Sequence, residues 1–176
     1  MRRIIYDVAV SLDGYISGPD GDISAFPAEG DHVDAYFSRL RDCGTVIMGR
    51  ATYEFGYACG LVPGSRAYPH MDHHIFSTGI RIPADSDVRV VRSDWAQALA
   101  ALRDGDGEDI YLCGGGRFAA FVAAHGLLDR VRLKRAPVVL GRGVPLFEGL
   151  ETPLRLRLQE HTCHASGVIY EDYASD

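Results

Sequence analysis

Residues 112–121 read LCGGGRFAAF, and they carry the strongest local signal in the sequence. The run Asp109–Cys113 that leads into it is short and apolar, as in a buried strand, and the residues after the glycines have the apolar spacing of a helix. Three glycines between them let the backbone turn tightly and leave the first helical N–H groups open to a phosphate. The stretch therefore predicts a strand, a phosphate-binding turn and a helix, although a tight turn without a ligand also fits it.

A second stretch of the same kind, VIMGRATYE, covers Val46–Glu54. Here Arg50 adds a forked cation at the start of the helix and Thr52 adds a hydroxyl, although an ordinary helix start with a solvated arginine also fits. Neither stretch has the GxGxxG or GxxxxGK(S/T) spacing, so those two nucleotide-binding folds are disfavoured. Two helix starts after parallel strands favour a diphosphate held between them, and hence a dinucleotide.

The alternation of strand and helix continues on both sides of these stretches. We expect strands at 4–10, 45–48, 73–77, 88–91 and 109–113, and helices at 31–42, from 49, at 94–103 and from the glycine triplet to Gly126. Asp31 and Asp94 are the expected helix caps. The later segments RVRLKR, TPLRLRLQEHT and SGVIYEDYA alternate with period two, which predicts antiparallel strands at one sheet edge. The pattern predicts an α/β fold with a doubly wound, mostly parallel sheet and antiparallel C-terminal strands.

Composition narrows the class of protein. A chain of 176 residues with 47% hydrophobic content is expected to form a single domain. With a net charge of −6 and no dense Lys/Arg cluster, we expect no nucleic-acid partner. We also expect no membrane partner and a cytoplasmic location, because no apolar run is long enough for a bilayer and no signal-peptide pattern opens the chain. The four scattered cysteines are expected to be free thiols.

Four motifs in order resemble one known family. SLDGYIS, VIMGRATYE, YLCGGGRF and APVVLGRGVPLFEG follow one another along nearly the whole chain. The chain resembles the dihydrofolate reductase superfamily, in particular the stand-alone branch similar to the reductase domain of bifunctional riboflavin-biosynthesis enzymes. The resemblance implies an NADPH-dependent reductase acting on a small conjugated heterocycle, and it makes a homodimer plausible.

The resemblance also implies which residues hold the cofactor. The phosphates would lie against Gly49, Arg50 and Thr52 on one side and Gly114, Gly115, Gly116 and Arg117 on the other. The 2′-phosphate would meet Ser77 and Thr78, with Arg92 at a position that is usually basic in the family. The nicotinamide would lie at the backbone of Val8 and Ala9 and the side chain of Ile16. Hydroxyls and an arginine, without an acidic residue for a ribose diol, favour NADPH over NADH.

The substrate side departs from the family. Dihydrofolate reductases hold the pterin with a carboxylate on the first helix, and the position that matches it here is Val33, flanked by Asp31 and Asp34. Asp34 is a catalytic candidate only if the helix is rotated or a gap intervenes in the match, and otherwise both aspartates cap the helix or face solvent. Asp13 in SLDG is a second catalytic candidate, with a turn aspartate as the alternative. Plausible walls for a flat ring are Tyr15, Phe26, Tyr53 and Tyr57.

Two other classes of function stay open. The first is a nucleotide-binding or ligand-sensing module without turnover, which would explain why Val33 stands in place of a carboxylate. The second is a structural dimer module that pairs through the C-terminal strands. We expect no metal site, because the histidines at 70, 73 and 74 and the group His161, Cys163 and His164 lack an organising metal-binding spacing and fit surface positions better.

Overall fold

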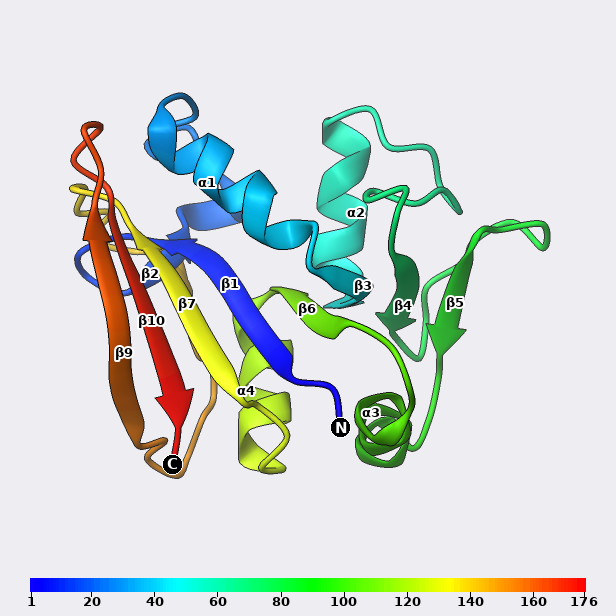
Figure 1. The fold of residues 1–176 in the computed structure, drawn as a ribbon. Coiled ribbons are helices and arrows are strands. Elements are labelled where there is room, and N and C mark those ends of the chain that lie inside the picture. Colours follow the sequence, from blue (N-terminus) through cyan, green and yellow to red (C-terminus); the bar gives the residue numbers. More distant parts are fainter.

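The computed structural model describes residues 1–176 and contains one eight-stranded sheet in the order β5-β4-β3-β6-β1-β7-β10-β9 (Figure 1). In this order, the strands from β5 to β7 run parallel to one another. β10 runs antiparallel to both of its neighbours, β7 and β9. The sheet strands are β1 (Ile4–Val10), β3 (Cys43–Gly49), β4 (Asp72–Phe76), β5 (Val88–Val91), β6 (Asp109–Gly114), β7 (Arg130–Arg135), β9 (Leu156–Cys163) and β10 (Ile169–Ser175). The expected mostly parallel α/β sheet with antiparallel C-terminal strands is confirmed.

One strand differs from the expectation. The segment RVRLKR, β7, was expected to join the antiparallel tail, but it pairs in parallel with β1 and in antiparallel only with β10. The reason is the helix that precedes it, because a helical crossover returns the chain in the same direction as the strand before it. β7 therefore belongs to the parallel part of the sheet and lies beside β1.

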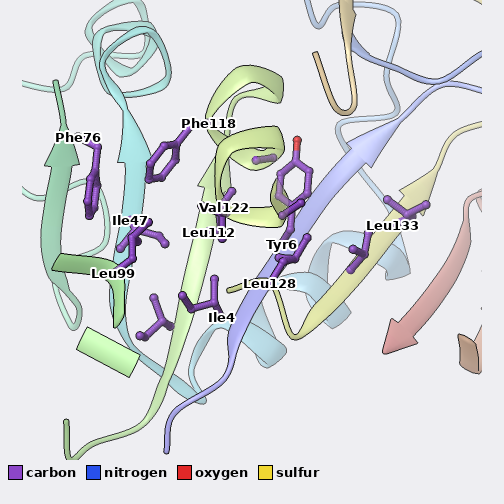
Figure 2. Packing of buried hydrophobic residues seen from close by; sticks show 14 of the residues in the cluster. Ile4, Tyr6, Ile47, Phe76, Leu99, Leu112, Phe118, Val122, Leu128 and Leu133 are labelled. Atoms are coloured by element: carbon purple, nitrogen blue, oxygen red, sulfur yellow. The ribbon is translucent and has the colours of Figure 1, made fainter. Parts of the chain in front are cut away.

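Four helices cover the two faces of the sheet. They are α1 (Asp31–Leu40), α2 (Arg50–Ala58), α3 (Trp95–Asp104) and α4 (Gly116–Ala124). In β3, Ile47 packs in the cluster that contains Leu99 of α3 and Phe118 of α4 (Figure 2). Val46, the residue before it, packs with Leu40 of α1. Since neighbouring residues of a strand point to opposite faces, α3 and α4 lie on one face and α1 and α2 on the other. None of the helices has the length and apolarity needed to cross a bilayer.

Neither expected capping residue forms a standard side-chain cap. Gly30 is the N-cap residue of α1, and Asp31 is the first helical residue. Its carboxylate accepts hydrogen bonds from the His32 and Ala165 amides and lies 3.1 Å from His164 Nδ1. Asp94 does occupy the N-cap position of α3, but in a left-handed conformation without a capping bond from its side chain. Asp31 therefore fastens the β9–β10 turn to α1, which a local sequence pattern does not show.

Two histidines expected at the surface are buried. His73 and His74 on β4 are 1% and 7% exposed. The Nε2 atom of His73 accepts hydrogen bonds from the amides of Ala67 and Tyr68, so Nδ1 carries the proton and donates to the Met71 carbonyl. Burial lowers the pKa of both rings, that of His74 to about 4. These histidines are uncharged parts of the core. His70 and His161 are exposed as expected, whereas the side chain of His164 is only 8% exposed.

Candidate functional site

The two glycine-containing helix starts lie side by side. β3 and β6 are neighbours in the sheet, with Met48 opposite Gly114, and each strand runs directly into a helix. Gly49 and Gly115 are the N-cap residues of α2 and α4, and neither helix has a capping side chain or an acidic residue in its first turn. Their first amides are therefore free to bind an anion.

Both helix starts open into one groove of about 700 Å³. Eight of the residues expected to hold the cofactor line it: Gly49, Arg50, Thr52, Ser77, Thr78, Gly115, Gly116 and Arg117. The remaining wall is largely aromatic and comes from Phe76, Trp95, Phe118 and Phe121. The indole N–H of Trp95 is buried without a hydrogen-bond partner, so this wall keeps an unused donor.

Two glycines of the triplet, Gly114 and Gly116, are required by their surroundings. Gly114 has φ = 129°, which side chains rarely permit, and the Gly114–Gly115 peptide is cis. A Cβ atom on Gly116 would lie 2.1 Å from the Pro145 carbonyl oxygen. The chain comes this close because the Glu148 amide donates a hydrogen bond to the Gly116 carbonyl. The segment around Val144–Glu148 is thereby held against the start of α4.

The charges in the groove are mainly positive. Arg50 and Arg117 are 58% and 85% exposed, and they form long contacts of 3.6 and 3.7 Å with Glu54 and Glu148. Exposed ion pairs of this kind contribute little, so both guanidinium groups are available to a ligand. Glu148 is the one carboxylate that lines the groove.

The expected 2′-phosphate residues lie at the far end of the same groove. Ser77 Oγ accepts hydrogen bonds from the Gly79 and Ile80 amides and keeps its own proton to donate, and Thr78 is exposed. Arg92 differs from the expectation, because it does not line the groove. Its guanidinium donates to the carbonyls of Thr78 and Ile80 and so supports the backbone of this loop.

Two further cavities continue from the groove. One of about 230 Å³ is lined by Val8, Gly114 and Ile16 of β2 (Tyr15–Ser17), and the other, of about 360 Å³, by Val8 and Ala9. Thr52 lines the groove and both cavities, so the three spaces adjoin. The residues expected at the nicotinamide therefore lie together, between the groove and the larger cavity.

The walls of the 360 Å³ cavity are mostly aromatic and aliphatic. Of the expected walls, Tyr53 lines it, Phe26 lines an adjoining cavity of about 100 Å³, and Tyr15 and Tyr57 line neither. The aromatic residues that the sequence reasoning missed are Tyr36, Phe55, Tyr68 and Tyr111. They come from separate elements, so no local spacing links them.

Sequence reasoning also missed the charged residues of this cavity, Asp7 and Lys134. Asp7 is 2% exposed, and its carboxylate lies 2.9 Å from Arg39 Nη2 and 3.8 Å from Lys134 Nζ. The one available signal was a charge inside the apolar run IIYDVAV, because a buried carboxylate needs a partner. The partner itself could not be found without knowing that β7 pairs with β1.

The two catalytic candidates do not reach these cavities. Asp34 lies on the exposed side of α1, while Val33 lines the 100 Å³ cavity, because neighbouring helical residues point about 100° apart. The Asp13 carboxylate accepts hydrogen bonds from Ser11 Oγ and from the amides of Leu140 and Gly141. The bond from Ser11 and these amide bonds hold the pKa of Asp13 below its ordinary value, which does not suit a proton donor. Asp13 therefore links its own loop to the loop that contains Leu140 and Gly141.

Comparisons with known proteins identify the family. The model of the family described as RibD C-terminal domain matches residues 2–170, and the chain belongs to this family of reductase-like proteins. The uncharacterized protein YwjB of Bacillus subtilis (strain 168) is 32% identical over 163 residues, which cover 90% of each chain.

Solved structures place the fold with the dihydrofolate reductase-like proteins. A Shewanella sp. PV-4 protein, provisionally assigned to riboflavin biosynthesis, superposes with a TM-score of 0.82 at 21% identity, covering 100% of this chain and 99% of that one. Dihydrofolate reductase from Enterococcus faecalis, solved with NADP(H), gives a TM-score of 0.66 at 18% identity and covers 99% and 96% of the two chains. The resemblance stated from the motifs is confirmed.

Proposed function

We propose that the protein is an NADPH-dependent reductase that transfers a hydride to a small conjugated heterocycle. The observation that carries the proposal is the pair of uncapped, glycine-started helices that line one groove. Free amides, the positive ends of two helix dipoles and two exposed arginines fit a diphosphate, and a groove of about 700 Å³ has room for a dinucleotide. The family and the relative solved with NADP(H) support the same cofactor.

Each part of the cofactor has residues that suit it. The amides at the starts of α2 and α4, with Arg50 and Arg117, would bind the diphosphate, and the aromatic wall offers Trp95 and Phe121 to the adenine ring. Ser77 and Thr78 would donate to the 2′-phosphate, with Arg92 supporting their loop. Val8, Ala9 and Ile16 would hold the nicotinamide end. When bound, NADPH supplies the hydride.

The 360 Å³ cavity is the proposed substrate pocket. It shares Val8, Thr52 and Cys113 with the cavity assigned to the nicotinamide, so a ring bound there would lie next to the cofactor. Its tyrosine and aliphatic walls suit a flat conjugated ring and exclude water from it. The chain's contribution is to hold that ring in place and to exclude solvent.

Cofactor preference tests this assignment. NADPH is expected to bind at least about 10-fold more tightly than NADH, because a 2′-phosphate that accepts hydrogen bonds from Ser77 and Thr78 adds charge-assisted bonds of about 1.5–3 kcal/mol each. Thr78→Ala should weaken NADPH binding and leave NADH binding unchanged, since the exposed Thr78 side chain supports nothing else. Titration calorimetry measures all four affinities. Equal affinities of the wild type for the two cofactors would contradict the roles given to Ser77 and Thr78.

A nucleotide-binding module without turnover is the second candidate. It is favoured by Val33, which lines the 100 Å³ cavity at the position that matches the first-helix carboxylate of dihydrofolate reductases. Tight NADPH binding without NADPH oxidation in the presence of pterin, aminopyrimidine or quinonoid compounds would favour this module. Oxidation with any of them would favour the reductase.

We further infer a single domain, a cytoplasmic location and a homodimer. The homodimer is supported by the outermost strand, β9, where every residue after Leu156 is exposed. An exposed edge strand of this length offers unpaired backbone groups to a second chain.

A further inference from the structure

Lys134 is the residue whose position the cofactor site does not explain. It lies on β7 opposite Ala9 of β1, and its side chain is 13% exposed. Its Nζ atom lies 3.1 Å from the centroid of the Tyr36 ring and forms no hydrogen bond. Both the 360 Å³ cavity and the adjoining 100 Å³ cavity are lined by Lys134. An ammonium group with three unused donors therefore borders the proposed substrate pocket.

The charges around Lys134 do not cancel. Asp7 is bound through Oδ2 by Arg39 at 2.9 and 3.2 Å, while its Oδ1 has no hydrogen-bond partner and lies 3.8 Å from Lys134 Nζ. Two cations and one carboxylate leave one positive charge in excess. Since an unbalanced charge in a buried place is unfavourable, the pocket favours a ligand that brings electronegative atoms to Lys134.

The tyrosine hydroxyls in the pocket are already paired and compete little for this role. The hydroxyls of Tyr36 and Tyr111 bond to each other at 2.7 Å, and the Tyr68 hydroxyl lies 3.7 Å from Cys113 Sγ. Of the residues that line the 360 Å³ cavity, only Asp7 and Lys134 carry a formal charge. The polar recognition of a ligand in this cavity therefore depends mainly on that pair.

We propose that Lys134 determines the specificity of the pocket by donating hydrogen bonds to a carbonyl oxygen or ionised edge of a flat heterocycle bound among the tyrosines. Asp7 acts as a positioning residue that holds the ammonium group at the pocket wall. The proposal rests on the proposed function in one respect, that the compound bound here is the one reduced. It predicts a preference for rings with acceptor edges over rings with amino groups in the same places.

The ammonium group should also make binding depend on pH. Burial lowers the pKa of Lys134 to about 8, an effect that Asp7 opposes and Arg39 reinforces. The charged and titratable groups that face it are Asp7 of β1, Tyr36 and Arg39 of α1, Cys113 and Tyr111 of β6, and Tyr170 opposite it on β10. Because only the protonated form binds an acceptor strongly, affinity should fall as pH rises through about 8.

Two pteridines with opposite edges test the proposal. 1,3-Dimethyllumazine presents two carbonyl oxygens and has no ionisable N–H, whereas 2,4-diaminopteridine presents two amino groups in their place. We expect the wild type to bind the dione at least about 10-fold more tightly in a fluorescence titration at pH 7. Lys134→Met, which keeps the volume without the charge, should lose at least about 10-fold in affinity for the dione and nothing for the diamine.

Further variants separate specificity from a structural role. Lys134→Arg should keep the preference for the dione, and its affinity for the dione should no longer fall above pH 8, because arginine stays protonated. Asp7→Asn should move the decline to lower pH, since the carboxylate stabilises the ammonium form. A role in folding alone would move neither pH profile. If Lys134→Met shows no unfolding transition in a thermal melt, the pH profile of affinity in Lys134→Arg distinguishes a specificity role from a structural one.

The outcomes also separate this proposal from the cofactor assignment. Equal affinities for the two pteridines, no binding of the dione, or an unchanged profile in Lys134→Arg would each overturn the role of Lys134 while leaving NADPH binding intact. If the wild type prefers the dione but does not bind NADPH, the specificity role of Lys134 is supported and the proposed function is overturned.

Discussion

Reversing the charge at both helix starts, in the double variant Arg50→Glu/Arg117→Glu, is expected to weaken NADPH binding by at least about 100-fold. Each arginine that bonds a phosphate contributes about 1.5–3 kcal/mol, and a glutamate in its place repels the diphosphate. Both side chains are more than half exposed and form only long surface ion pairs, so the fold should survive. Calorimetric titration with NADPH measures the loss.

A matched control lies outside the groove. Arg157 on β9 is 69% exposed and forms a similar 3.8 Å contact with Asp176, and nearby Arg155 is also exposed. The double variant Arg155→Glu/Arg157→Glu therefore changes the net charge by the same amount without touching the site. It should leave NADPH affinity within about twofold. If the Arg50→Glu/Arg117→Glu variant binds NADPH as tightly as the wild type does, the two arginines do not contribute to binding. If the control loses as much NADPH affinity as that variant, the arginines act only through the overall charge of the protein.

Gly116→Ala is expected to lower the free energy of unfolding by about 3 kcal/mol. A Cβ atom at this position would lie 2.1 Å from the Pro145 carbonyl oxygen, and that neighbour is backbone, so the segment Val144–Glu148 must move away. Forced overpacking of this kind costs about 1–3 kcal/mol and more where the neighbour cannot yield. Urea unfolding followed by circular dichroism gives the difference in free energy.

Gly79→Ala is the matched control for this prediction. A methyl group on Gly79 would meet no atom within 4 Å, and the φ angle of this residue lies outside the left-handed region. The substitution should therefore change the free energy of unfolding by less than about 0.5 kcal/mol. Equal stability of Gly116→Ala and the wild type would mean that the segment around Pro145 does not press against the start of α4.

The lining of the groove could be predicted because its signals are local. In VIMGRATYE and LCGGGRF, a strand, a glycine and a helix start follow one another directly, and parallel neighbours bring such starts to the same sheet edge. The groove accordingly contains Gly49, Arg50, Gly115 and Arg117. Arg92 was placed by its position in the family, but its guanidinium bonds to carbonyls of the neighbouring loop.

The lining of the proposed substrate pocket could not be predicted because its residues meet only through the fold. Lys134 occurs in the alternating segment RVRLKR, where a polar position usually faces solvent, and it is covered because Tyr36 of α1 packs against it. Asp13 and Asp34 are carboxylates near positions that bind ligands in the family. Asp13 nevertheless accepts hydrogen bonds from the Leu140–Gly141 loop, and Asp34 faces solvent. The direction of a side chain depends on register, which spacing alone did not determine here.

Amide chemical shifts during a titration with NADP⁺ test most directly that the two helix starts bind one diphosphate. In ¹H–¹⁵N spectra of the labelled protein, the amides of Arg50, Ala51, Gly116 and Arg117, which lie at the two helix starts, should shift together and fit a single dissociation constant. Shifts at only one of the two helices, or none at either while other regions respond, would contradict the account.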